Sequence, residues 1–141
     1  MSEFALALIV ALTGWWFSTG VILWLVHRNE RHHRTIFALA TATMLLAYYG
    51  VETSVHQSSP QSVVLAFCLA LLLWGWLEMG YLMGFFTGPR KEACPLGAST
   101  ASRMRLGLRT CLWHELTLLL MVAVLAWLSW QQPNQTALWT F

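Results

Sequence analysis

The fold is decided by residues 62–86, which read SVVLAFCLALLLWGWLEMGYLMGFF. Glu78 is the one charged residue in this stretch. About 20 helical residues span the roughly 30 Å hydrocarbon core of a bilayer, because each residue rises about 1.5 Å. The stretch is therefore long enough to cross a membrane as a helix. Ser59 as N-cap and Pro60 at the first helical position predict where that helix begins.

Three further apolar stretches have the same character. They run from Phe4 to Val26, from Ile36 to Val51 and from Thr110 to Trp130. Nothing shows the alternating pattern of a membrane barrel, and backbone groups in lipid must be bonded internally, so helices are expected. We predict an all-α, polytopic membrane protein with four transmembrane helices in residues 1–130. Residues 131–141 are expected to be a periplasmic tail or the start of an incomplete further segment.

The composition supports this fold class. Hydrophobic residues make up 57% and charged residues 10% of the 141 residues, where a globular chain has about 25% charged. The mean hydropathy is +0.58. These values exclude soluble enzymes, disordered tails and secreted disulfide scaffolds. The three cysteines are spread too widely for a C-x-x-C site, so we predict reduced thiols, and the start Met1–Glu3 lacks the basic region of a cleaved signal peptide.

The basic residues predict the topology. All eight fall in two loops: Arg28, Arg31 and Arg34 in the first, and Arg90, Lys91, Arg103, Arg105 and Arg109 in the third. Both loops must lie on one side of an alternating four-helix path. The positive-inside rule predicts that this side is cytoplasmic, so the N-terminus, the loop around His56 and the C-terminal tail are expected outside.

Three polar residues are expected to meet within the membrane. Glu78 is placed about 12 Å from the cytoplasmic end of its helix, and His114 and Glu115 enter the fourth segment from the same side. Because an intramembrane acid is costly, we predict that Glu78, His114 and Glu115 form a polar cluster. The cluster either fixes helix register, or provides an axial imidazole for a tetrapyrrole through His114 or His56, or holds a metal ion or proton. We predict no particular metal ion, because the Glu-x-x-His repeat of two-metal helical bundles is missing from the sequence.

Glycines form a second pattern. Gly80, Gly84 and Gly88 make a G-x-x-x-G-x-x-x-G row at the end of the third stretch. Such a row lets another helix approach closely, so we predict a helix-packing face that binds another helix of this chain or a partner protein. A phosphate loop, a Ser-His-Asp order, an H-E-x-x-H motif and an extended basic nucleic-acid surface are all missing from the sequence. Enzyme activity therefore has little support, and no nucleic-acid partner is expected.

Six short motifs together resemble a known family. They are WWFSTG at 15–20, WGWLE at 74–78, TGPR at 87–90, CPLG at 94–97, WHEL at 113–116 and PNQTALWT at 133–140. In this order, over nearly the whole chain, they are similar to the PuhE-type photosynthetic complex assembly proteins of purple phototrophic bacteria. Members of that family extend beyond the position of Phe141, and no chemistry is established for the positions of Glu78, His114 and Glu115.

The resemblance implies a multi-pass protein of the bacterial inner (intracytoplasmic) membrane. Its implied function is assembly or accumulation of the photosynthetic reaction centre and light-harvesting complex. The implied partners are membrane lipid and the polypeptides of those complexes, and bacteriochlorophyll or a precursor is the implied cofactor. A homo-oligomer is compatible with this function. The alternatives are a small proton-coupled transporter and a haem- or chlorin-binding membrane protein.

Overall fold

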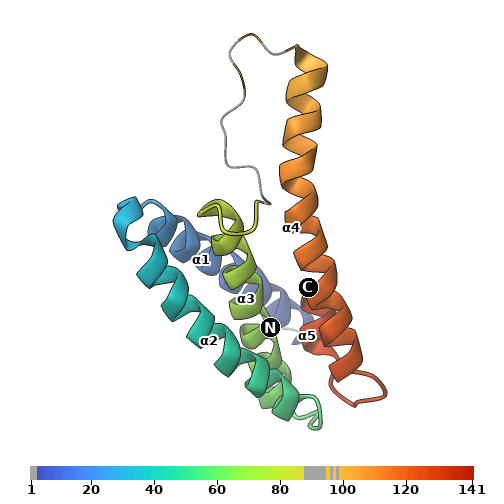
Figure 1. Ribbon diagram of the computed structural model, residues 1–141. Helices are drawn as coiled ribbons and strands as arrows, with labels where there is room; N and C mark the ends of the chain where they lie inside the picture. Colours follow the sequence, from blue (N-terminus) through green and yellow to red (C-terminus); the bar gives the residue numbers. More distant parts are fainter. Residues whose placement is uncertain (1–2, 88–94, 96, 98) are drawn as a thin grey trace.

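The computed structural model describes residues 3–87, 95, 97 and 99–141, and every element in them is helical (Figure 1). The elements are α1 (Glu3–Val26), the 3-10 turn η1 (Glu30–His32), α2 (His33–Ser54), α3 (Pro60–Leu82), α4 (Thr100–Leu128) and α5 (Thr136–Thr140). Four of these described helices are long and apolar enough to cross a membrane. The predicted all-α, four-span fold is confirmed.

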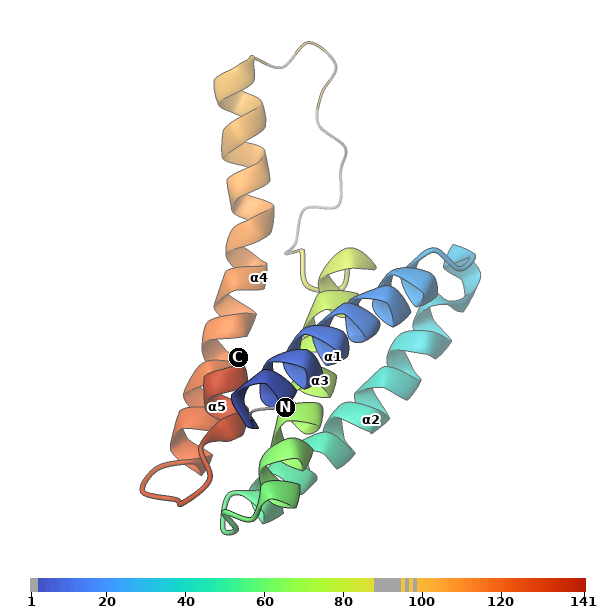
Figure 2. The same cartoon turned by 180° about the vertical axis from the view of Figure 1, so that it is seen from behind.

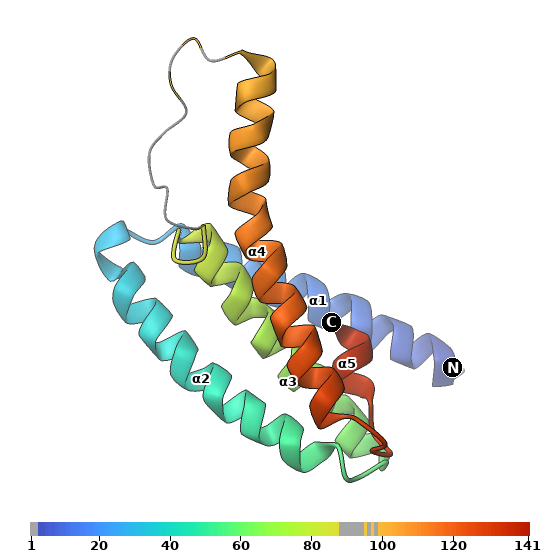
Figure 3. The same cartoon turned by 45° about the vertical axis from the view of Figure 1, so that its right-hand side comes forward.

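The third helix lies at the centre of the bundle. α1 and α2 diverge from the η1 turn, and α3 packs between them and also against α5. Seen from behind, α1 crosses α3 obliquely (Figure 2). α4 lies to one side, and its first turns project beyond the ends of the other helices (Figure 3). α3 therefore contacts helices on both sides of the molecule.

Helix caps explain where two helices begin. The Ser59 hydroxyl accepts a hydrogen bond from the Ser62 N–H, with Pro60 in the first turn, as the sequence predicts. The Ser99 side chain does the same for the Ser102 N–H, so α4 begins at Thr100, ten residues before the predicted Thr110. The hydropathy pattern did not indicate this extension, because Arg103, Arg105 and Arg109 make the stretch too polar to be recognised as part of a membrane span.

The small core lies at the end of the bundle near α5. Its buried side chains are Ala47, Val51, Val55, Ala66, Ala70, Leu73, Leu125 and Ala137. Alanine and valine allow helix backbones to approach closely, which is how helices associate in lipid. The final segment is part of this core, because Ala137 on α5 is 1% exposed. Residues 131–141 thus pack against the four-helix region rather than extending away from it.

Asn134 holds this end together. Its Nδ2 donates to the carbonyls of Ser54 and Ser62, and its Oδ1 accepts from the Thr136 N–H. Its backbone N–H donates to the Val55 carbonyl. Asn134 thereby forms hydrogen bonds with backbone groups at the end of α2, the start of α3 and the start of α5.

Candidate functional site

Glu78 on α3 and His114 on α4 meet between the two helices. The His114 Nε2 lies 3.3 Å from the Glu78 Oε1, and the side chains are 11% and 22% exposed respectively. Both residues lie within candidate membrane spans. A charge in that environment is costly unless it is paired. The pair therefore satisfies two polar groups that neither helix could satisfy alone.

Tyr81 and Cys111, which were not predicted as site residues, also lie at this site. The Tyr81 ring stacks on the imidazole with centroids 4.4 Å apart and 24° between the planes. The Tyr81 hydroxyl lies 3.6 Å from the Cys111 Sγ. Tyr81 is three residues after Glu78, and Cys111 is three before His114, so helical spacing places each beside its partner. That spacing is the signal that could have identified them.

The other imidazole nitrogen has no hydrogen-bond partner in the part of the chain that the structure describes. The His114 Nδ1 is buried and has no hydrogen bond within the described residues. A protonated Nδ1 would be a buried N–H without an acceptor, which is rare and costly. The contacts therefore place a ring proton on Nε2, which faces the Glu78 carboxyl group; this assignment is inferred from the contacts.

Glu115 does not join the pair. It is exposed on α4, and the structure shows no hydrogen bond or ion pair from it to Glu78 or His114. Adjacent helical residues point about 100° apart, so one cannot follow the other into the same interface. Among the described residues, no three His, Cys, Asp or Glu side chains gather as a metal site would require. The three-residue cluster is corrected to a pair, and a three-ligand metal site at this position is contradicted.

The depth of Glu78 is also corrected. α3 ends at Leu82, four residues before the predicted Phe86. Glu78 is therefore four residues from the helix end, which is about 6 Å at the helical rise. The acid therefore lies nearer to the end of its helix than the sequence indicated.

The two candidate axial ligands differ in access. At His114, Nε2 faces Glu78, Nδ1 is buried, and Tyr81 covers one ring face, so neither nitrogen is open to a tetrapyrrole metal. His56 is exposed, and its Nδ1 lies 2.9 Å from the Gln132 Oε1. If Nδ1–H donates to that oxygen, Nε2 is the unprotonated nitrogen, which is the arrangement that second-shell partners impose on ligating histidines. Of the two, His56 is the more accessible imidazole.

The predicted glycine row is not a helix face. Gly84 lies beyond the end of α3 with φ of +80°, a conformation that glycine adopts without strain. The Phe85 N–H donates to the Gly80 carbonyl, and the Gly84 N–H donates to the Tyr81 carbonyl. This is a Schellman motif that ends the helix.

The surface over Gly80 is also occupied. Phe86 folds back over Gly80, so that a Cβ added there would collide with the Phe86 ring. A close approach by another helix at Gly80 is thus blocked by the chain itself. Gly88 lies outside the described residues. The helix-packing prediction for Gly80 and Gly84 is wrong, because the first four-residue step of the pattern ends a helix instead of continuing it.

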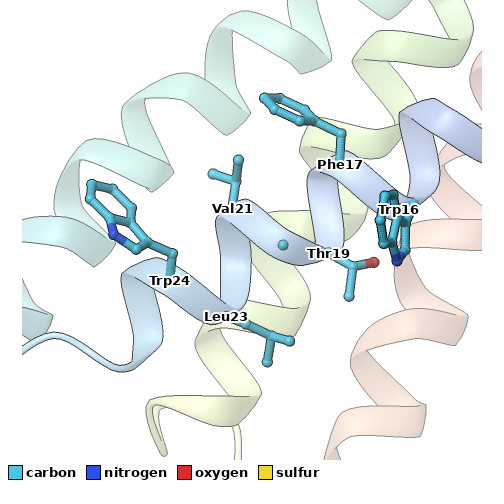
Figure 4. A pocket seen from close by; sticks show the side chains of 7 residues that line it. Trp16, Phe17, Thr19, Val21, Leu23 and Trp24 are labelled. Atoms are coloured by element: carbon cyan, nitrogen blue, oxygen red, sulfur yellow. The ribbon is translucent and has the colours of Figure 1, made fainter.

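An exposed hollow on α1 is the better candidate for helix packing. Its lining residues all come from α1: Trp16, Phe17, Thr19, Gly20, Val21, Leu23 and Trp24 (Figure 4). Trp16 is 81% and Trp24 59% exposed, and a Cβ added to Gly20 would meet nothing within 4 Å. Trp16, Gly20 and Trp24 are four residues apart and share one helix face. Two large rings thus flank a position without a side chain.

Of the four tryptophans at positions 15, 16, 74 and 76, three pack against other helices of this chain. The Trp15 and Trp74 ring centroids are 4.5 Å apart. The Trp76 indole N–H donates to the Thr41 hydroxyl, and its ring contacts Phe37 and Phe86. Trp16 is the exception, since it faces outward. Tryptophan richness in this chain therefore reflects contacts between its own helices as well as exposed rings.

Four bilayer-length helices, two of which are joined by an acid–imidazole pair, define a polytopic α-helical membrane protein. The chain belongs to the family described as "Protein of unknown function (DUF3623)", whose pattern matches residues 1–141. It is 36% identical over 141 aligned positions to an uncharacterised 30.4 kDa protein in the puhA 5′ region of Rhodobacter capsulatus, covering 94% of this chain and 51% of the relative. The chain thus spans about half the length of that relative. No solved structure matches it.

Proposed function

We propose that the chain is an integral membrane assembly factor or accessory subunit of the bacterial photosynthetic reaction centre and light-harvesting complex, of the PuhE type. The observation that carries the proposal is the relative encoded in the 5′ region of puhA, a photosynthesis gene. The motifs at 15–20, 74–78 and 113–116 support it by their resemblance to such proteins. The proposed location is the inner (intracytoplasmic) membrane.

The exposed surface is compatible with binding other membrane helices. Large apolar side chains on α1 and α4 are open, including Trp16, Leu119 and Trp127. In lipid, helix association depends on close van der Waals contact, which a notch at a small residue provides. The exposed hollow on α1, with Gly20 at its centre, is the site that we propose for a helix of a reaction-centre or light-harvesting polypeptide. Bacteriochlorophyll or a precursor is the pigment that such a complex would bring, with His56 as its candidate ligand.

Deletion of the gene in its host, with a tagged copy for purification, tests the proposal. We expect the deletion to lower the near-infrared absorbance of the assembled complexes. We also expect the tagged chain to co-purify in mild detergent with reaction-centre or light-harvesting polypeptides. Recovery of the chain alone, together with normal complexes in the deletion strain, would refute the function.

Gly20→Leu tests the proposed contact face, and Gly107→Leu is its control. At both positions an added Cβ meets no atom within 4 Å, so the chain itself tolerates the side chain. Gly20→Leu fills the hollow and should reduce co-purification, while Gly107→Leu on the projecting part of α4 should not. Equal recovery of partners with both variants would place the contact elsewhere.

Proton-coupled transport is a second candidate, favoured by the Glu78–His114 pair in the membrane. That function predicts a different outcome in the same strains. Glu78→Gln would abolish pH-driven uptake in vesicles while the photosynthetic complexes stay at their normal level. Loss of the complexes without any transport activity would exclude it.

A further inference from the structure

A long apolar groove runs along the bundle between α1 and α2. It has a volume of about 560 Å³, with α3 as its floor. Its ends are marked by Gly14 and Leu25 on α1 and by Cys68 and Met79 on α3. The lining residues outside α3 come from α1 and α2, the two helices that diverge from the η1 turn (Figure 1).

The groove has the length of one bilayer leaflet. Gly14 and Leu25 are eleven residues apart, as are Cys68 and Met79, which corresponds to about 16 Å along each helix. Half of the hydrocarbon core is about 15 Å. One extended acyl chain that begins at the membrane surface would therefore fill the groove from end to end.

The surface end of the groove leads to a basic turn. Leu25 and Ile36 line the groove, and between them lie Arg28, Arg31 and Arg34, all exposed. Glu30 is the only acid in this turn, and none of the three arginines forms an ion pair with it among the described residues. Arg28 stacks on the Trp24 ring and Arg31 donates to the His32 Nε2, but no ion pair with a carboxylate neutralises these arginines within the described residues.

The turn itself is held in a fixed shape. The His33 Nε2 lies 3.0 Å from the Val26 carbonyl and 3.1 Å from the Arg28 carbonyl, both of which are acceptors at the end of α1. The Asn29 side chain accepts from the Arg31 N–H. The Arg28 guanidinium lies 4.1 Å above the Trp24 ring, a cation–π contact at the interface. The arginines are thus presented from an ordered turn rather than from a free loop.

From this combination we infer that the groove binds one anionic phospholipid of the surrounding leaflet. An acyl chain lies between α1 and α2, and the phosphate lies at the basic turn that joins these two helices. Basic residues next to a membrane span attract anionic headgroups, and a matching apolar channel converts that attraction into a site for one molecule. This inference is independent of the proposed function, since a transporter or an assembly factor could equally hold such a lipid.

Native mass spectrometry of the full chain in mild detergent tests the inference, with phosphatidylglycerol and phosphatidylcholine of identical acyl chains as probes. We expect one phosphatidylglycerol per chain to be retained under conditions that strip phosphatidylcholine. Arg28→Gln combined with Arg34→Gln should lower retention about thirtyfold, the order expected for losing two basic residues near an anionic headgroup. The control is Arg105→Gln with Arg109→Gln on α4, which should leave retention unchanged.

A second pair of variants tests the groove. Ala40 lines it, whereas Ala42, on the same helix, is exposed and does not. Ala40→Leu should lower phosphatidylglycerol retention, and Ala42→Leu should not. Equal retention of the two lipids by the unaltered chain would overturn the inference. So would equal effects of the two leucine variants, or a dimer that Ala40→Leu dissociates, because the groove would then be a protein interface.

Discussion

At the scale of single residues, the contact between Glu78 and His114 joins α3 to α4. Most large apolar side chains of α4, such as Leu108, Leu112 and Leu120, are exposed, so this helix has little other packing near the pair. Each member of the pair satisfies the other in a region where water is scarce. Removing one member leaves the other without its partner, which costs more than the pair contributes when both are present.

His114→Ala should therefore destabilise the chain in detergent by about 1 to 3 kcal/mol. The expected loss of stability is modest because the Glu78 side chain is partly exposed. A double-mutant cycle with Glu78→Ala should show a coupling energy, measured by thermal unfolding. Glu115→Ala is the control and should change stability by less than about 0.5 kcal/mol. Additive effects of the two changes would contradict an interaction between the two side chains.

At the scale of elements, the end of α3 is set by backbone geometry. The carbonyls of Gly80 and Tyr81 are satisfied by the Schellman motif, which requires the left-handed conformation of Gly84. This ending turns the following chain back, so that Phe86 covers Gly80 and contacts Trp76. The position of Glu78, close to the end of its helix, follows from this stop.

Gly84→Ala should lower the stability of the chain by about 1 to 2 kcal/mol, because an L side chain is strained in the left-handed region. Gly20→Ala offers a comparison within a regular helix, where alanine is favoured by up to about 1 kcal/mol and meets no neighbour. The two substitutions should thus shift the unfolding temperature in opposite directions. A shift of the same sign and size in both would show that Gly84 does not need its positive φ.

At the scale of the whole molecule, the alternation of four spans fixes which loops share a side. The turn at residues 27–32 and the start of α4 lie at one end, while the loop at residues 55–59 and Gln132 lie at the other. The hydrogen bond between His56 and Gln132 confirms that these last two segments meet. Which end is cytoplasmic stays a prediction from the positive-inside rule.

Labelling of single cysteines with a membrane-impermeant maleimide decides the orientation, in a background where the three native cysteines are replaced. Ser58→Cys and Gln131→Cys should react in intact cells with a permeabilised outer membrane. Asn29→Cys and Ala101→Cys should react only after the inner membrane is opened. All four positions are exposed. Labelling of Ser58→Cys and Ala101→Cys from the same side would contradict the four-span path itself.

The sequence alone determined the class of fold, the number of spans and the meeting of Glu78 with His114. Length and hydropathy decide spanning, because lipid forces the backbone into helices, and a loop between antiparallel spans brings those two residues to one level. Only the tertiary structure decided that Glu115 faces away, that Gly84 ends a helix and that α1 and α2 diverge around a groove. These depend on helix rotation, on one positive φ and on how neighbouring side chains pack, none of which a hydrophobic pattern specifies.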